Sequence, residues 1–205
     1  MQALNTLLRT LAKLPGMGPR SAQRVALHVL AEPSRLTGLV QALADAATKL
    51  GTCPQCGNLA EKPEAEATAL CPICANPARA TGVICVVEGV ADIWAMEKGG
   101  TFGGHYHVLG GVVSALQGVG PAQLRLGQLA GRLQSAHPPV TEVILALGAS
   151  IEGQTTGHLV AEMVHRDAPK AIVTSLAKGM PVGANVDYLD ESTLTLALQH
   201  RQPLA

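Results

Sequence analysis

Apolar residues in the first fifty positions recur at helical spacing, every three or four residues. The pattern predicts one helix over residues 1–13, a second after residue 19 and a third over residues 34–50. The glycine- and proline-rich segment at residues 15–19 separates the first two, because proline and glycine end helices. The longest apolar stripe belongs to the third helix and comprises Leu36, Leu39, Val40, Leu43, Ala46, Ala47 and Leu50.

From residue 82 onward the apolar pattern changes its period. Short continuous apolar runs of the kind found in buried parallel strands alternate with helical segments. The runs lie at residues 83–87, 106–109, 143–147 and 171–173, and the helical segments at about 90–98, 124–134 and 154–165. Alternation of this kind predicts a mainly parallel sheet with helices on both faces, and therefore an α/β fold class.

Four cysteines in two C-x-x-C pairs stand between these two parts, Cys53 with Cys56 and Cys71 with Cys74. Each pair offers two thiolates, and the fourteen intervening residues let both pairs meet at one tetrahedral zinc ion. Four thiolates would leave no open coordination position, so such a zinc would be structural rather than catalytic. The fifth cysteine, Cys85, lies in an apolar run and is expected to be a small buried hydrophobic residue.

Two disulfides or a redox C-x-x-C are the alternatives for the cysteine pairs. Disulfides need an oxidising compartment, and residues 1–10 lack the apolar core of a signal peptide. A redox motif would occur once, directly after a strand, rather than twice across a polar loop. These considerations favour structural zinc and a cytoplasmic location.

Composition and charge narrow the function classes. The chain has 205 residues, 47% hydrophobic and 15% charged, and no apolar run approaches the roughly 18 residues that a membrane span requires. The net charge is zero, but residues 1–35 carry five cations against the single acid Glu32, a local basic region that attracts phosphate. Aromatic residues make up only 2%, which favours contacts to the nucleic-acid backbone over base stacking.

The glycine pair Gly16 and Gly18 stands immediately before a helix whose first position is a proline. Glycine tolerates positive φ and a close ligand, and a helix N-terminus presents free N–H groups, which together predict a phosphate cradle. Arg20 and Arg24 are four residues apart and share one helix face, suited to successive phosphates. The alternative is an ordinary turn between packed helices, with both arginines on a solvated face.

Three acidic residues fall near the predicted ends of strands. Glu88 ends one strand, Asp92 follows one helical turn later, and Glu152 comes after the strand at 143–147. Because the carboxyl ends of parallel strands form the ligand edge of a sheet, we expect these carboxylates to converge there, an arrangement that suits Mg²⁺. His105 and His107 alternate on a strand, where packed positions are commoner than metal ligands.

The sequence LPGMGPRSAQR at residues 14–24 resembles the helix–hairpin–helix of the bacterial recombination mediator family RecR. The resemblance continues in the same order through the C4 zinc finger. It then includes ICVVE at residues 84–88, YHVLGG at 106–111, EVILAL at 142–147 and GMPVG at 179–183. These motifs cover nearly the whole chain, so the resemblance is specific.

The resemblance implies a domain order as well as a fold. It places a helix–hairpin–helix DNA-binding region at residues 1–52 and a C4 zinc finger at 53–76. A Toprim-like domain, a mainly parallel sheet covered on both faces, would follow at 77–175, and an assembly segment at 176–205.

The resemblance also implies a function without catalysis, that of a DNA-binding mediator of recombinational repair. Such a protein works with RecO, and in some settings RecF, to load RecA onto gapped single-stranded DNA. It would assemble as a ring, taken here as a tetramer, in the cytoplasm and on the nucleoid. Gly16, Gly18, Arg20 and Arg24 would face the DNA, and the acidic edge near residues 88, 92 and 152 would face RecO or hold Mg²⁺ weakly.

A Toprim nuclease or primase with a zinc module for template binding is the principal alternative. Toprim enzymes use a glutamate and an Asp-x-Asp pair, whereas residues 148–152 read GASIE and offer a single acid. One carboxylate too few weakens a two-metal mechanism. Gly89 also follows Glu88 where the family commonly has another acid. A third interpretation is a zinc-stabilised scaffold whose arginines are merely solvated.

Overall fold

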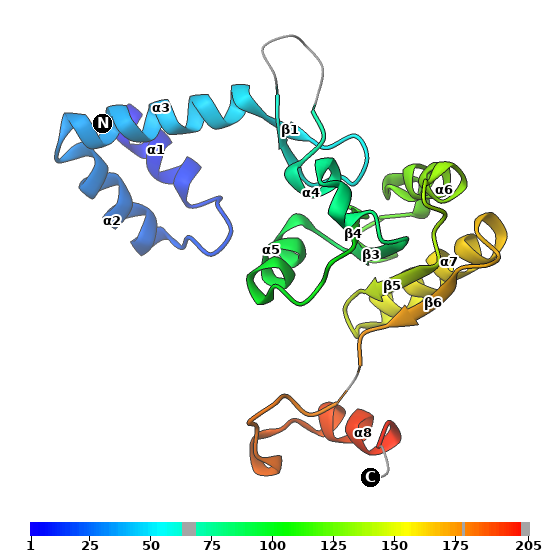
Figure 1. Cartoon of the computed structure of the whole chain (residues 1–205). Helices are drawn as coiled ribbons and strands as arrows, with labels where there is room; N and C mark the ends of the chain where they lie inside the picture. Colours follow the sequence, from blue (N-terminus) through cyan, green and yellow to red (C-terminus); the bar gives the residue numbers. More distant parts are fainter. Residues whose placement is uncertain (63–68, 178, 202–205) are drawn as a thin grey trace. The chain divides into compact units, whose positions relative to one another are not determined.

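The computed structural model describes residues 1–62, 69–177 and 179–201, which fall into two compact units. The first unit holds residues 1–51 together with Glu61 and Lys62. The second holds Thr52–Ala60 and the described residues from 69 onward. Figure 1 shows the elements of both units, coloured along the sequence. Within these described ranges, no helix is both long and apolar enough to cross a membrane.

Three helices form the first unit: α1 (Gln2–Leu11), α2 (Pro19–Leu30) and α3 (Pro33–Lys49). They confirm the three predicted helices, with boundaries moved by one or two residues. Ala22 and Ala26 are the buried residues in the described part of this unit, each 1% exposed. Small side chains at these positions let the helices approach closely, but they make a minimal core. Much of the apolar stripe of α3 is therefore exposed, including Leu39, Val40 and Leu43.

A four-stranded parallel sheet organises the second unit, in the order β4-β3-β5-β6. Each strand falls within one or two residues of a predicted apolar run, and all three pairings are parallel, as the α/β pattern predicted. The central strand β3 aligns Cys85 with Tyr106 on one side and with Ile144 on the other. The strands are β3 (Val83–Val87), β4 (His105–Val108), β5 (Glu142–Ala146) and β6 (Ile172–Ser175).

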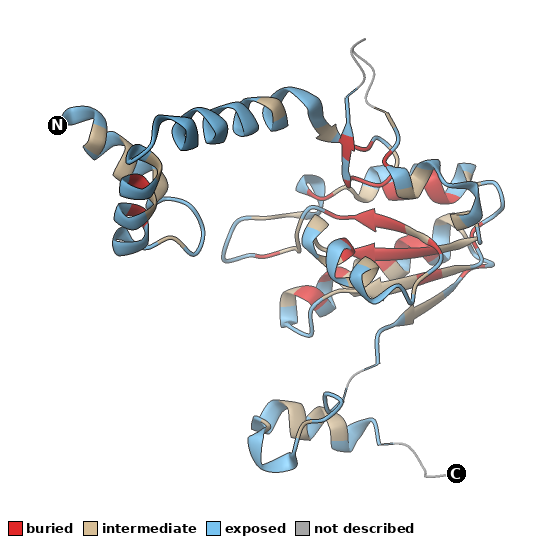
Figure 2. Ribbon diagram, turned by 60° about the vertical axis from the view of Figure 1, so that its left-hand side comes forward, coloured by how far each residue is buried: buried red, intermediate tan, exposed pale blue. Residues whose placement is uncertain are grey.

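Helices cover both faces of this sheet, as predicted. Side chains of alternate residues on β3 belong to two different apolar clusters. Cys85 and Val87 pack with Ile93 of α5 (Val90–Gly99), whereas Ile84 and Val86 pack with residues of α6 (Leu126–Ser135) and α7 (Ile151–Asp167). Figure 2 shows the buried residues concentrated along the central strands. Cys85 is fully buried, as expected of a small hydrophobic residue.

Short elements connect and extend this framework. The strands β1 (Leu50–Thr52) and β2 (Leu59–Glu61) pair with each other, and the boundary between the two units falls within them. The remaining elements are α4 (Pro72–Ala75), η1 (Pro77–Arg79), η2 (Pro121–Gln123), η3 (Val186–Tyr188) and α8 (Glu191–Gln199). Asp190 caps α8 by accepting a hydrogen bond of 3.0 Å from the Thr193 N–H.

Candidate metal centre and nucleic-acid interface

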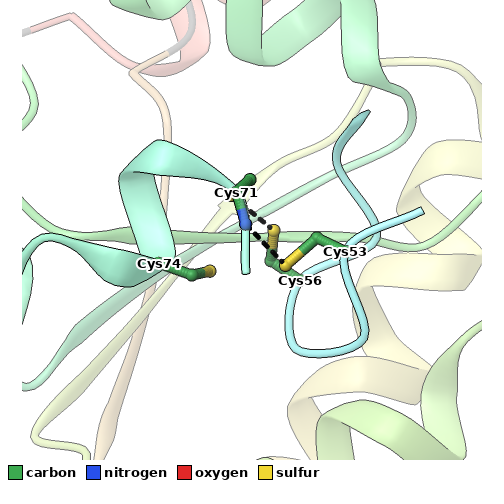
Figure 3. Close-up of side chains that lie close together, drawn as sticks. All are labelled: Cys53, Cys56, Cys71 and Cys74. Carbon is green, nitrogen blue, oxygen red and sulfur yellow. Dashed lines mark hydrogen bonds between the residues drawn. The ribbon is translucent and has the colours of Figure 1, made fainter. Parts of the chain in front are cut away.

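The four cysteines of the two C-x-x-C pairs converge on one point. Their sulfur atoms all lie within 4.8 Å of one another, and Figure 3 shows the side chains turned toward a common centre. The Sγ atoms of Cys56 and Cys71 are 3.6 Å apart. A tetrahedral zinc with bonds of about 2.3 Å places its sulfurs about 3.8 Å from one another, so the site fits this ion. All five cysteines are free thiols, and 3.6 Å far exceeds a disulfide bond of about 2.05 Å, which removes the disulfide alternative.

Backbone N–H groups point at two of the sulfur atoms. The N–H of Cys71 donates to the Sγ of Cys53, and the N–H of Asn58 donates to the Sγ of Cys56, each over 3.4 Å. The thiols share protons: hydrogen bonds from Cys56 and Cys74 lower the pKa of Cys71, and the same hydrogen bonds raise the pKa of Cys56 and of Cys74. Thiolates are the form that binds metal, so these donors suit a metal site.

The cysteine site is attached directly to the sheet of the second unit. The Val108 N–H at the end of β4 donates to the Cys56 carbonyl over 2.7 Å. Ile73, between the second pair of cysteines, packs against both the cysteine cluster and the apolar cluster around Tyr106. A metal bound here would hold the two cysteine segments against β4.

The glycine turn before α2 has the geometry of an open helix N-terminus. Gly16 has φ +76°, which favours glycine, and Gly18 is the extended N-cap with Pro19 at the first helical position. A Cβ added at Gly16 or Gly18 would meet no atom within 4 Å, so the turn is open to an approaching ligand. The backbone N–H groups of Arg20 and Ser21 find no acceptor among the described residues.

Arg20 and Arg24 both lie exposed on α2. The buried Ala22 and Ala26 occupy the opposite side of the helix, which packs in the small core of the first unit. Neither arginine lies within ion-pair distance of a carboxylate in the part of the chain that the structure describes. The structure thus brings Gly16, Gly18 and both arginines to one end and one face of α2.

The expected convergence of Glu88, Asp92 and Glu152 on a magnesium site is not seen. Over residues 1–62, 69–177 and 179–201, only the cysteines bring three or more ligand atoms of His, Cys, Asp or Glu together. Glu88 instead accepts a hydrogen bond of 2.6 Å from the Gly148 N–H, and Asp92 accepts one of 2.8 Å from the Gly89 N–H. Glu152 lies in the first turn of α7. One oxygen of Glu88 and one of Asp92 thus bind backbone N–H groups, and the three carboxylates do not form a cluster.

Three basic residues close to the cysteine site were not predicted as site residues. Neither Arg125 nor Arg132 was singled out from the sequence, and His107 was expected to be a packed position. Arg132 of α6 is 8% exposed and donates to the Tyr106 carbonyl over 2.6 Å. Arg125, the N-cap residue of α6, has a buried Nε atom. His107 is fully buried, its Nε2–H donates to the Arg125 carbonyl over 3.0 Å, and burial lowers its pKa to about 4. In the sequence, the only indication of a shared role was the seven-residue spacing of Arg125 and Arg132, which is two helical turns.

Comparison with known proteins identifies three segments of this chain. Residues 4–47 match the family model described as RecR, helix-hairpin-helix; residues 82–175 match the Toprim domain; and residues 179–202 match RecR, C-terminal. The chain is 50% identical to a protein named Recombination protein RecR from Rhodospirillum rubrum, over 98% of both chains. It is 48% identical to proteins of the same name from Paracoccus denitrificans and a Caulobacter species, over 98% of this chain and 96% of each relative. Similarity at this level over essentially full length, together with the hairpin, the four-cysteine cluster and the parallel sheet, shows that the chain belongs to the RecR family.

Proposed function

We propose that this protein is a non-enzymatic, DNA-binding mediator of recombinational repair. It acts with a RecO partner, and in some settings with RecF, to help load RecA onto gapped single-stranded DNA in the cytoplasm. The observation that carries this proposal is the open start of α2, where Arg20 and Arg24 are exposed and free of carboxylates among the described residues.

The chemistry of the hairpin suits a phosphate backbone rather than bases. Free N–H groups and the positive end of the helix dipole attract an anion to the first turn of α2. Arg20 and Arg24 add two guanidinium groups one turn apart, which can donate to neighbouring phosphate oxygens. Contacts of this kind position a protein on DNA without reading its sequence.

The four cysteines, in this proposal, hold a structural zinc ion. The bound ion contributes folding free energy, because ligands that are far apart in an unfolded chain are held together only when it binds. Within this chain, Cys53, Cys56, Cys71 and Cys74 would supply all four thiolates, and Val108 and Ile73 connect their segments to the sheet. Loss of the zinc ion would therefore release the cysteine segments from β4.

The exposed apolar stripe of α3 supports self-assembly. Leu39, Val40 and Leu43 are 41%, 57% and 62% exposed, an unusual density of aliphatic side chains on one surface helix. A second copy of the chain is the occupant we propose, in a ring-shaped oligomer taken as a tetramer, with residues 176–205 as a further assembly segment. Mass measurement in solution, with and without a chelator, would report the oligomer size, the zinc content and their dependence on each other.

A Toprim nuclease or primase is the competing function. It requires a complete acidic set, whereas Glu88 and Asp92 accept backbone hydrogen bonds here, and residues 148–152 contribute one acid. Purified protein that cleaved or primed DNA with Mg²⁺, and lost that activity on Glu88→Gln substitution, would establish the enzyme instead.

Charge reversal on α2 tests the proposed DNA interface. The double substitution Arg20→Glu with Arg24→Glu should weaken binding to duplex and gapped DNA by about a hundredfold or more, because two phosphate contacts become repulsions. The matched control is Arg35→Glu, since Arg35 belongs to the same unit but already pairs with Glu32 over 2.9 Å. The control should bind within a few-fold of wild type. Undiminished binding by the double variant at physiological salt would contradict the assignment, provided that both proteins keep the same oligomer size.

A further inference from the structure

We propose that Arg125 and Arg132 neutralise the charge of the metal-loaded cysteine site and thereby set its affinity for the metal. Four thiolates outweigh the charge of one Zn²⁺, so the loaded site is a doubly negative centre. Negative charge in a buried site needs nearby compensation. The inference rests on the proposed zinc site and is independent of the proposed DNA binding.

Arg132 is a buried cation without a carboxylate counter-ion. Its side chain is 8% exposed, and its Nη1 atom donates to the carbonyl of Tyr106 on β4. No carboxylate of the described residues lies within ion-pair distance of this guanidinium. Arginine keeps its charge in proteins, and buried arginines are rare unless they are paired. Arg132 therefore needs an anionic partner of another kind.

Arg132 and the turn between Cys53 and Cys56 border one cavity. The arginine lines the same cavity of about 480 Å³ as Pro54 and Gln55, the two residues between Cys53 and Cys56. None of the residues that line this cavity is acidic. Burial lowers the pKa of Arg132, and negative charge on the four cysteines partly opposes that shift. The shared cavity and the sign of this effect both support a charge interaction between Arg132 and the cysteine site.

Arg125 approaches the same site from the start of α6. It precedes Arg132 by seven residues, two helical turns, which places both arginines on the same side of α6. Its Nε atom lies 2.7 Å from the position that a Cβ at Gly57 would occupy, and Gly57 directly follows Cys56. That Nε is buried and has no hydrogen-bond acceptor among the described residues. Gly57, with φ +82°, leaves the space that Arg125 fills.

The two arginines make the metal site and α6 depend on each other. With metal bound, Arg125 next to Gly57 and Arg132 in the cavity beside Pro54 and Gln55 would both lie close to a negative centre. Without the metal, four adjacent thiolates would repel one another, so the site holds less negative charge, and the buried Arg132 and the buried Nε of Arg125 lose part of their compensation. We therefore expect metal removal to loosen α6 from β4 as well as to release the cysteine segments.

Metal affinity provides the direct test. Zinc affinity is measured by competition with a chromophoric chelator, and the pH midpoint of Co²⁺ loading is followed through the thiolate-to-cobalt absorption band. Arg132→Gln should weaken zinc binding by about tenfold or more and raise the pH midpoint, because loss of the positive charge makes the thiolates harder to form. Arg132→Lys keeps the charge and should stay within a few-fold of wild type.

The control is Arg79→Gln, another partly buried arginine of the same unit. Arg79 pairs with Glu97, so its loss should lower stability and leave metal affinity unchanged. If Arg132→Gln folds and binds zinc with wild-type affinity and an unchanged pH midpoint, the proposal is overturned. If Arg132→Gln does not fold even with excess zinc, the test moves to Arg125→Gln. A severalfold loss of zinc affinity in Arg125→Gln would support the proposal, and wild-type zinc affinity would overturn it. Wild-type protein that takes up neither zinc nor cobalt would overturn both the zinc assignment and this inference, while the DNA-binding proposal would stand.

Discussion

The two units of this protein use their polar groups in opposite ways. In the first unit, the N–H groups at the start of α2 and the arginines on its face have no partner among the described residues. In the second unit, the cysteines face one another, and Glu88 and Asp92 accept hydrogen bonds from the backbone. Polar groups directed outward are available to a ligand, whereas polar groups directed inward maintain the fold. The helix-hairpin-helix segment and the Toprim domain thus differ in what their charged residues are free to do.

Substitution of one cysteine ligand should have the largest effect on the stability of the second unit. Cys71→Ser should abolish zinc binding and lower stability by about 5 kcal/mol or more, since structural zinc contributes apparent binding free energies of roughly 10–16 kcal/mol in zinc-finger peptides. Zinc content by native mass spectrometry and the free energy of unfolding by urea denaturation provide the measurements.

The matched control for the cysteine prediction is Cys85→Ala. Cys85 is equally buried but belongs to the apolar cluster of the sheet rather than to the metal site. Its substitution should cost about 1 kcal/mol and leave the zinc content at one ion per chain. Equal zinc loss in both variants would mean that the cysteine site depends on general packing and not on its own ligands.

Protonation of His107 should have the next largest effect. Its pKa is about 4 in the folded protein and about 6.5 in an unfolded chain, so the unfolded state binds more protons between these values. Stability should therefore fall as pH decreases from about 6.5 to about 4, by about 3 kcal/mol in total. His107→Gln should remove this part of the pH dependence, and the difference between the two stability profiles separates it from acid release of zinc. Parallel profiles would contradict a neutral, inward-directed histidine.

Loss of the Glu88 carboxylate should have a smaller effect. Glu88→Ala leaves the exposed Gly148 N–H to water and should cost about 1 kcal/mol, whereas Glu88→Gln retains an acceptor oxygen and should cost less. Thermal unfolding of both variants and of wild type should be insensitive to millimolar Mg²⁺. A stabilisation of wild type by Mg²⁺ that Glu88→Gln abolishes would show that this carboxylate binds metal after all.

The sequence was most informative where chemistry depends on local spacing. Two C-x-x-C pairs and the turn before α2 are short motifs, so their residues are brought together by one turn or one helix start. Strand positions were likewise predicted, because each buried strand of a parallel sheet is a continuous apolar run. The acidic residues were different, since their convergence depended on three elements and on which backbone groups needed acceptors.

The positions of Arg125 and Arg132 also depend on tertiary packing that the sequence does not reveal. Neither Arg125 nor Arg132 lies near a cysteine in the sequence, and only the packing of α6 beside β4 brings Arg132 to the Tyr106 carbonyl. The start of α7 at Ile151 rather than near residue 154 also depends on a hydrogen bond, in which Ser150 accepts the Gly153 N–H over 3.1 Å. Periodicity identifies which face of an element is buried but not what it meets there.

Salt dependence of DNA binding tests most directly whether the first unit directs its polar groups to phosphate. The measurement compares the slope of log Kobs against log salt for wild type and for a neutral double variant, Arg20→Gln with Arg24→Gln, on the same duplex. We predict a steep wild-type slope that becomes shallower by about 1.8 in the double variant, because each lost phosphate contact removes roughly 0.9. Identical slopes for the two proteins, with oligomer size unchanged, would show that Arg20 and Arg24 are solvated surface residues and would contradict the proposed phosphate contacts.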